Sequence, residues 1–301
     1  MKLCYTEDMK LHMEKFSHYL SDEKNLSKNT LDSYNRDIKQ YLHFVSTYRS
    51  DTDWKEKSTV FHHLRLMKSN GKAAATIHRN LVSLRAFFQF LLRNQLVDSD
   101  PTADLESPKI DKKEPVILSV REVESILQMP DMQSSMGIRD KAMMELLYAT
   151  GLKVSELVAL DESDIDLNTG FIYCRSLGRE RIVPIGASAE QALVRYSEER
   201  ISYFLRSKTE TAFFLNNHGQ RLSRQGFWKI LKKYSVTADV NKEITPHTLR
   251  HSFANHLLAS GADIHAVKEM LGHSDITSTQ VYKPNVKLKL KEVYMSHHPR
   301  A

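Results

Sequence analysis

The chain has 301 residues, enough for two domains that each bury a core, and its formal net charge is +6. This mild basic excess is compatible with an acidic polymer as partner, but it is also common among soluble proteins. Cys4 and Cys174 are too few for a disulfide framework and lack metal-ligand spacing. Because no apolar run could span a membrane and residues 1–8 lack a hydrophobic signal core, we expect a cytoplasmic protein with no membrane partner.

Residues 1–107 have the apolar periodicity of a helical domain. One stripe runs from Leu31 to Val45, and Ser27 or Asn29 is available to cap the start of that helix. A second stripe covers residues 77–91 and is rich in phenylalanine. We expect its aromatic side chains to form a core rather than to stack on bases.

A basic face lies opposite the second stripe. Its members are Lys72, His78, Arg79 and Arg85. Such a face can follow a phosphate backbone, although a solvated helix surface has the same composition. The residue pattern alone leaves both interpretations open.

Residues 108–116 are polar, charged and bounded by prolines, a composition typical of a linker. We therefore expect one domain at residues 1–107 and a second at residues 117–301. Two domains joined by a flexible basic connection could close around a duplex.

The second domain begins with helical periodicity over residues 123–127 and 142–149. The pattern then changes, because residues 171–173 and 182–185 are rich in β-formers and flank a turn that contains Gly178. This arrangement predicts a small hairpin. Helices are expected again from residue 190 onward.

A second basic surface is predicted on one of these later helices. It contains Arg224, Lys229, Lys232 and Lys233. Residues 287–294 form a further lysine-rich segment near the end of the chain.

One helix of the last quarter combines a clear start with two polar residues on one face. Thr245 is suited to the N-cap, and Pro246 to the first helical position, where its missing N–H has no cost. His247 then lies in the first turn and Arg250 shares its face, three residues on. On the other side Phe253, Leu257 and Leu258 are expected to enter a core.

A second short helix, residues 264–271, is expected to end at Gly272 and to leave His273 at the following turn. Ser274 or Asp275 can cap a next segment that carries Tyr282. The tyrosine would therefore lie on its own, separately capped segment.

These side chains suit chemistry at phosphorus. A guanidinium and two imidazoles can stabilise the charge that develops on the non-bridging oxygens of a pentacoordinate phosphate. A tyrosine oxygen is a plausible nucleophile that would form a covalent phosphotyrosine. Each residue alone is more commonly structural or exposed. His247 and His251 also have the i, i+4 spacing of a zinc helix, but Thr248 stands where a metalloprotease has Glu, so we expect no metal.

The runs at residues 246–254 and 271–274, followed by Tyr282, resemble the signature of tyrosine site-specific recombinases, most closely the Xer type. Further matching segments make the resemblance nearly chain-wide: residues 137–140, 146–152, 155–157, 180–184, 222–226 and 297–301.

The resemblance implies a mainly α fold. An N-terminal helical core-binding (SAM-like) domain would clasp one side of the DNA, which favours Lys72, Arg79 and Arg85 as DNA-binding residues, with Arg224 and Lys229 in the second domain. The C-terminal part would be a mixed α/β catalytic domain with a small β-hairpin or sheet. Its last helix would dock into a neighbouring protomer.

The resemblance also implies an activity: Tyr282 would attack a scissile phosphate held by Arg250, His247 and His273, leaving a 3′-phosphotyrosine and a free 5′ hydroxyl. No cofactor is implied. The implied partners are a double-stranded recombination site, further protomers in a homo- or hetero-tetramer, a second Xer recombinase and a DNA translocase. Chromosome dimer resolution is the expected role, with integration of a mobile element as the alternative.

Two positions depart from the family pattern. Lys153 stands where the first catalytic arginine is expected, and a lost transition-state donor costs about 2.7–4 kcal/mol, of which the retained charge recovers part. Ser176 stands at the position of a catalytic lysine, and a lost general acid costs on the order of a hundredfold to ten-thousandfold. Arg175 and Arg179 flank that turn but are poor proton donors. The supporting Glu156 is retained.

Two hypotheses follow. The chain is either a strand-exchange enzyme with reduced or partner-dependent activity, or a cleavage-deficient DNA-binding partner in a recombination complex. A metal-dependent hydrolase built on His247 and His251 is a third, less favoured interpretation.

Overall fold

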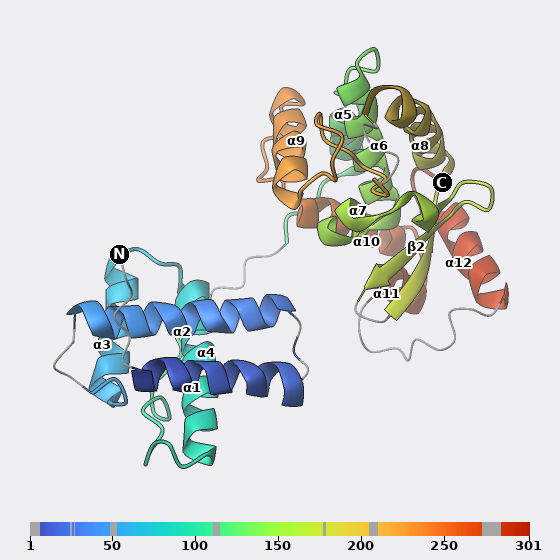
Figure 1. The fold of residues 1–301 in the computed structure, drawn as a ribbon. Helices are drawn as coiled ribbons and strands as arrows, with labels where there is room; N and C mark the ends of the chain where they lie inside the picture. Colours follow the sequence, from blue (N-terminus) through green and yellow to red (C-terminus); the bar gives the residue numbers. More distant parts are fainter. Residues whose placement is uncertain are drawn as a thin grey trace. The chain divides into compact units, whose positions relative to one another are not determined.

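The computed structural model describes residues 7–24, 26, 28–48, 53–110, 115–176, 179–204, 210–272 and 284–301. The chain separates into two compact units, residues 1–113 and 114–301 (Figure 1). Within the described ranges, no helix is both long enough and apolar enough to cross a membrane.

The first unit is helical. The described part of this unit contains the α-helices α1 (Glu7–His18), α2 (Lys28–Tyr48), α3 (Lys57–Ser69) and α4 (Ala74–Arg93), with a π-helical turn at Tyr19–Glu23. Helix α2 begins at Lys28, so Asn29 lies inside it and the expectation that Asn29 could be the cap is wrong; Ser27 lies outside the described residues.

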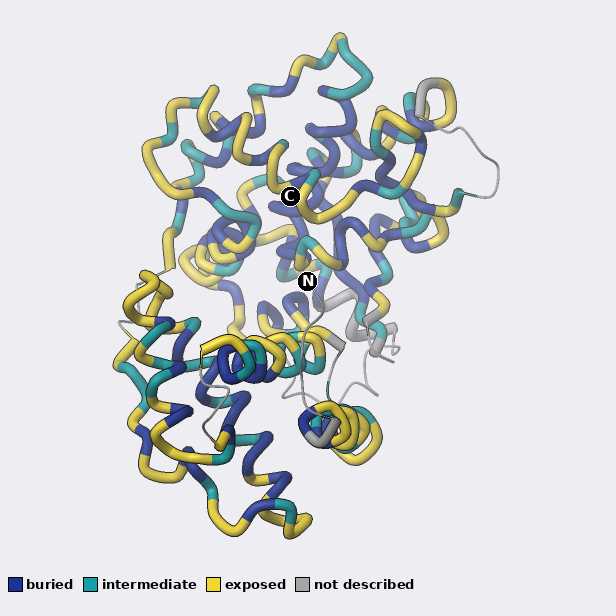
Figure 2. Tube along the Cα trace, turned by 60° about the vertical axis from the view of Figure 1, so that its left-hand side comes forward, coloured by how far each residue is buried: buried dark blue, intermediate teal, exposed yellow. Residues whose placement is uncertain are grey.

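The predicted aromatic stripe of α4 forms the core of this unit. Phe87 and Phe88 are fully buried, and the Phe87 ring lies 5.3 Å from that of Phe16 on α1, edge to face. Figure 2 shows the buried residues along the inner faces of the helices. The expectation of a core rather than a base-stacking surface is confirmed.

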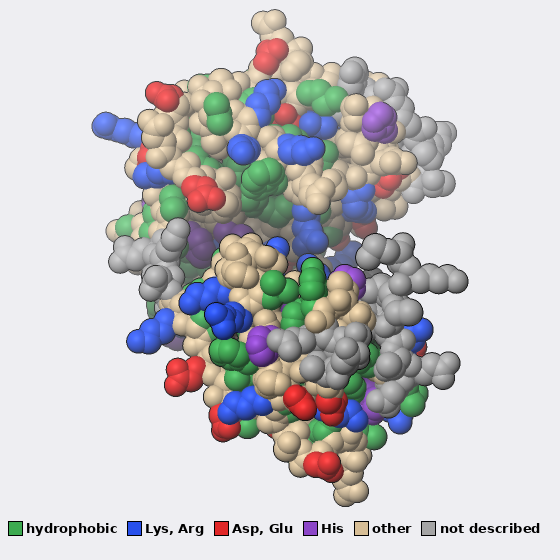
Figure 3. Space-filling view, turned by 90° about the vertical axis from the view of Figure 1, so that its left-hand side faces the viewer, with side chains coloured by type: hydrophobic (Ala, Val, Ile, Leu, Met, Phe, Trp, Pro, Cys, Tyr) green, Lys and Arg blue, Asp and Glu red, His purple; other side chains and the backbone are tan. Residues whose placement is uncertain are grey.

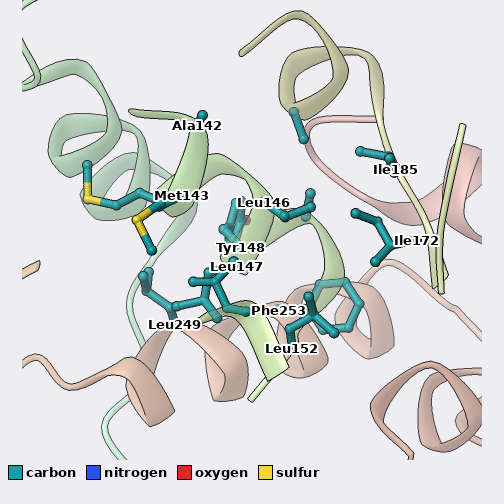
Figure 4. Packing of buried hydrophobic residues seen from close by; sticks show 14 of the residues in the cluster. Ala142, Met143, Leu146, Leu147, Tyr148, Leu152, Ile172, Ile185, Leu249 and Phe253 are labelled. Atoms are coloured by element: carbon teal, nitrogen blue, oxygen red, sulfur yellow. The ribbon is translucent and has the colours of Figure 1, made fainter. Parts of the chain in front are cut away.

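The second unit surrounds helix α6 (Ser135–Thr150), whose residues are buried from Gly137 to Thr150, with one partly buried residue among them. The other α-helices are α5 (Val120–Gln128), α7 (Val154–Ala159), α8 (Ala187–Glu199), α9 (Arg224–Thr237), α10 (Pro246–Ala259), α11 (Ile264–Leu271) and α12 (Pro284–His297). Leu146 and Leu147 of α6 pack with Leu249 and Phe253 of α10 in one core (Figure 4). Gly151 and Leu152, which directly follow α6, are buried as well.

The predicted hairpin is present as β2 (Phe171–Ser176) and β3 (Arg179–Pro184). A two-residue strand, β1 (Ile165–Asp166), extends it to a three-stranded antiparallel sheet of order β1-β2-β3. This third strand is too short to produce an alternating pattern. The register pairs Cys174 with Arg181.

Helix α10 shows one departure from the expected core. Phe253 and Leu257 are fully buried, whereas Leu258 is 41% exposed. Leu257 and Leu258 are adjacent on a helix, so their side chains point about 100° apart and the prediction for Leu258 is wrong.

Candidate active site

Arg250 lies where three helices meet. Helix α10 begins as predicted, with the Thr245 hydroxyl accepting the Thr248 N–H and Pro246 in the first turn. This start places Arg250 one turn further on, with its side chain buried. Its Nη1 donates to the Gly151 carbonyl at 2.5 Å and its Nη2 to the Leu271 carbonyl at 2.7 Å.

The environment of Arg250 leaves it charged. Burial lowers the pKa of its guanidinium from the ordinary value, and the negative charge of Glu156 opposes this. An arginine stays protonated under either influence. Arg250 is therefore a fixed cation, held by the carbonyls at the ends of α6 and α11.

His247 and His251 lie on the outer face of the same helix, and both are exposed. Partial burial lowers the pKa of His251, and the charges of His247 and Arg250 lower it further. The three side chains are thus electrostatic neighbours, as their spacing predicts. No group of three or more His, Cys, Asp or Glu side chains with the proximity of a metal site occurs in the described part of the chain.

Lys153 lies close to the Arg250 anchor in the sequence. Gly151 ends α6 with a left-handed φ of 60°, and Lys153 is the residue before the first turn of α7. The Lys153 N–H donates to Glu156 Oε2 at 2.8 Å, while its side chain is exposed. Glu156 thus fixes the backbone of Lys153, whose exposed ammonium can face a ligand.

Glu156 has a second partner that the sequence reasoning missed. Arg181 Nη1 donates to Oε1 and Arg181 Nη2 to Oε2, both at 2.7 Å. This bidentate pair and the Lys153 N–H outweigh the opposing effect of burial and hold the pKa of Glu156 below its ordinary value. The sequence signal that could have found Arg181 is the alternation of side chains along a strand. Arg181 lies two residues before Val183, which is fully buried, so the two side chains point to the same face.

The hairpin carries the second departure from the family pattern. Ser176 is the last residue of β2 and pairs in register with Arg179. Arg175 is 61% exposed and pairs with Asp164 at 2.8 Å and Glu180 at 3.5 Å. Arg175 directly follows Cys174 in the strand, so its side chain lies on the sheet face opposite the Cys174–Arg181 pair. Arg175 therefore contributes no charge to the Glu156 cluster.

His273 and Tyr282 both lie outside the described residues. The element before them is confirmed, because α11 runs from Ile264 to Leu271 and ends at Gly272 with a left-handed φ of 67°. The structure therefore brings Arg250, Lys153 and Glu156 together and adds Arg181 to this group. The positions of His273 and Tyr282 relative to it are not described.

The predicted DNA-binding residues of the first unit differ in their contacts. Lys72 is exposed in the turn before α4. Arg79 donates to the buried Asp37 at 2.8 Å, and Arg85 donates to the Leu105 carbonyl. Lys72 is thus the member of the set whose charge is most available to a partner.

In the second unit, Arg224 and Lys229 are exposed on α9. Lys232 on the same helix lies 5.2 Å from the centre of the Trp228 ring, which is itself 43% exposed. Figure 3 shows basic side chains on the visible face of each unit, with exposed hydrophobic ones among them. Cations beside an exposed indole suit a nucleic-acid surface.

Comparison with known proteins identifies the family of this chain. The Phage integrase family profile matches residues 117–287, and that of the Phage integrase, N-terminal SAM-like domain matches residues 13–95. The chain belongs to the phage integrase family. Within it, the chain is a Xer-type tyrosine recombinase, an enzyme of site-specific DNA recombination that catalyses DNA cleavage and rejoining.

Two curated relatives have matching length. This recombinase is 48% identical to tyrosine recombinase XerD of Oceanobacillus iheyensis, over 96% of this chain and 98% of that one. It is 44% identical to tyrosine recombinase XerD of Halalkalibacterium halodurans, over 98% and 100% of the two chains. The similarity therefore covers both units.

A solved structure shows the same fold. The XerH site-specific recombinase, bound to its difH substrate before cleavage, superposes with a TM-score of 0.71 at 19% identity and covers 98% of this recombinase and 95% of XerH. The mainly α architecture with a small sheet in the second unit is confirmed.

Proposed function

We propose that Tyr282 is the nucleophile of this recombinase. Its oxygen would bond to the scissile phosphorus while the 5′ oxygen of the next nucleotide leaves and takes up a proton, giving a 3′-phosphotyrosine and a free 5′ hydroxyl. An incoming 5′ hydroxyl then reverses the step and rejoins the strand. The phosphate is held by a cationic set: Arg250, His247, His273 and Lys153.

The observation that carries this proposal is the anchoring of Arg250. Two of its five N–H groups are bound to the carbonyls of Gly151 and Leu271. The other N–H groups remain for phosphate oxygens, and a guanidinium already fixed in place needs no reorganisation when charge develops there.

Lys153 supplies the second charge in this proposal. Its backbone is fixed by Glu156 and its side chain is exposed. An ammonium contacts phosphate oxygens as a point charge, without the two-pronged geometry of arginine. Position 176 offers a serine hydroxyl where the family has a proton donor, so slow or partner-dependent cleavage is expected.

The proposed setting is a chromosome. XerD relatives matched over nearly their full length favour chromosome dimer resolution over integration of a mobile element. The partners would be a double-stranded recombination site, further protomers in a tetramer, a second Xer recombinase and a DNA translocase. The proposed location is the cytoplasm, and no metal or nucleotide cofactor is needed.

The test is a nicked suicide substrate carrying a Xer-type site, with and without a partner recombinase. The expected result is a covalent protein–DNA adduct that survives EDTA and is absent from Tyr282→Phe. Tight binding without any adduct under every partner condition would contradict the proposal. An adduct lost in EDTA would favour metal-dependent chemistry instead.

The departures at Lys153 and Ser176 support a second candidate function, a partner that binds the site without cutting. Under this alternative the wild-type chain forms no adduct, while Lys153→Arg combined with Ser176→Lys restores cleavage. A double variant that remains inactive would show that these two positions are not what limits cleavage.

A further inference from the structure

The Glu156–Arg181 pair joins three elements of the site. Arg181 is on β3 and Glu156 on α7, and Arg181 Nε donates to the Met270 carbonyl of α11 at 2.9 Å. The Arg181 side chain is 12% exposed and that of Glu156 is 6% exposed. The pair is therefore largely shielded from solvent, where removing one partner leaves a costly unpaired charge.

The two oxygens of Glu156 are occupied by three donors. Oε1 accepts Arg181 Nη1, while Oε2 accepts Arg181 Nη2 at 2.7 Å and the Lys153 N–H at 2.8 Å. The Lys153 ammonium is exposed and acts on Glu156 through its charge, which helps to lower the pKa of that carboxylate. Lys153 is the N-cap residue of α7 and Glu156 its third helical residue, two positions that lie close together at a helix start.

Arg181 also bounds the backbone that leads to His273. A Cβ at Gly272 would lie 2.9 Å from Arg181 Nη1 and 3.1 Å from its Cζ. The guanidinium thus lies directly against the last described residue before His273.

We propose that Arg181 is a positioning residue that occupies Glu156, so that this carboxylate does not capture the ammonium of Lys153. The inference rests on the proposed function, which assigns Lys153 to the phosphate. Without Arg181, Glu156 is a shielded anion that needs a new partner, and Lys153 is the cation nearest in sequence. Pairing within the protein then removes a cation from the phosphate.

If Arg181 keeps Glu156 from pairing with Lys153, the double variant should behave differently than if the role of Arg181 is purely structural. Arg181→Gln should slow single-turnover adduct formation at saturating DNA by about a hundredfold, comparable with the loss of one transition-state donor. Arg181→Gln with Glu156→Gln should recover at least tenfold of this, because a neutral amide does not trap the ammonium. Arg181→Lys, which keeps the charge, should be intermediate.

Arg175→Gln is the matched control, since this arginine lies on the same hairpin and makes no contact with Glu156. It should cleave like the wild type. Melting temperatures of all variants identify any that fail to fold.

A second readout does not depend on cleavage. Lysines can be labelled by reductive ¹³C-methylation, which keeps their charge, and the Lys153 signal assigned by its loss in Lys153→Ala. In Arg181→Gln the Lys153 methyl signal should move from its wild-type position as the ammonium pairs with Glu156, and in the double variant it should return. If the wild type forms no adduct, the proposed function fails and this movement still decides the role of Arg181. A Lys153 signal unchanged in Arg181→Gln would overturn the inference, as would a double variant no faster than Arg181→Gln.

Discussion

Arg300 is bound to Glu145, in the middle of α6, by two hydrogen bonds. Its Nη2 donates to Oε1 at 2.5 Å and its Nε to Oε2 at 2.8 Å. Leu290 and Tyr294 of α12 are buried in the same unit. In this structure of the single chain, residues 290–301 thus pack on their own catalytic unit, whereas the family resemblance led us to expect the last helix in a neighbouring protomer.

Arg300→Ala should destabilise the catalytic unit. The Glu145 side chain is 1% exposed and would keep only Lys141, at 2.8 Å, as a charged partner. Breaking a buried pair costs about 3–5 kcal/mol, and we expect about 2 kcal/mol here because Lys141 remains and Arg300 is partly exposed. Urea unfolding followed by circular dichroism measures this, with the exposed Arg121→Ala as control. Equal stability of the two variants would contradict the prediction.

His298 should make the recombinase less stable in acid. Its Nδ1 accepts the Tyr294 hydroxyl at 3.1 Å and the Arg300 N–H at 3.2 Å, so protonation at Nδ1 removes the acceptor of both bonds. Burial is the main cause that lowers the pKa of His298 to about 3. The unfolded state, with a histidine pKa near 6.5, therefore binds the proton first, and the free energy of unfolding falls as the pH drops from about 6.5 toward 3.

Between pH 7 and pH 5 this histidine should account for a loss of about 2 kcal/mol. His298→Gln should be less stable at pH 7 and should lose less on acidification. The exposed His265→Gln is the control and should retain the wild-type slope. Urea unfolding at the two pH values measures both. An undiminished pH slope in His298→Gln would argue against this assignment.

Gly272→Ala should cost more stability than Gly261→Ala. Both glycines have positive φ, 67° and 93°, which disfavours any side chain. A Cβ at Gly261 would have nothing within 4 Å, whereas one at Gly272 would press on Arg181. We expect a loss of about 1 kcal/mol at Gly261 and roughly twice that at Gly272. Equal melting temperatures would show that Arg181 moves aside freely.

Lys153→Arg should raise the rate of adduct formation. A guanidinium can contact two phosphate oxygens at once, which Lys153 does not do, and one such donor is worth about 2.7–4 kcal/mol in the transition state. Because the lysine charge already supplies part of this, we expect about a tenfold gain in single-turnover cleavage. Lys229→Arg, on α9, is the matched control. A gain of similar size there would point to binding rather than to the chemical step.

Lys72→Ala and Arg85→Ala should differ in the salt dependence of DNA binding. Lys72 is exposed, whereas Arg85 donates to the Leu105 carbonyl and, at 3.5 Å, to the Ser107 hydroxyl. The slope of log K against log salt is negative, and removing one phosphate contact reduces its magnitude by about 0.9. Fluorescence anisotropy in the Tyr282→Phe background should show this decrease for Lys72→Ala alone. The reverse ranking would mean that Arg85 leaves its internal partners on binding DNA.

Local patterns in the sequence determined the helix starts and ends and most of the core. Thr245 and Pro246 begin α10, Gly272 ends α11, and the phenylalanine stripe of α4 is buried. These features depend on hydrogen bonds and periodicity within a few residues, so they can be predicted without knowing the fold.

Only the tertiary structure decided which charges meet. Arg181 reaches Glu156 across 25 residues and Arg250 reaches the Gly151 carbonyl across 99. The sequence likewise did not predict the exposure of Leu258 or the contact of Arg300 with Glu145. A buried ion takes its partner from whatever packing brings within hydrogen-bond distance, and packing depends on segments far apart in the chain.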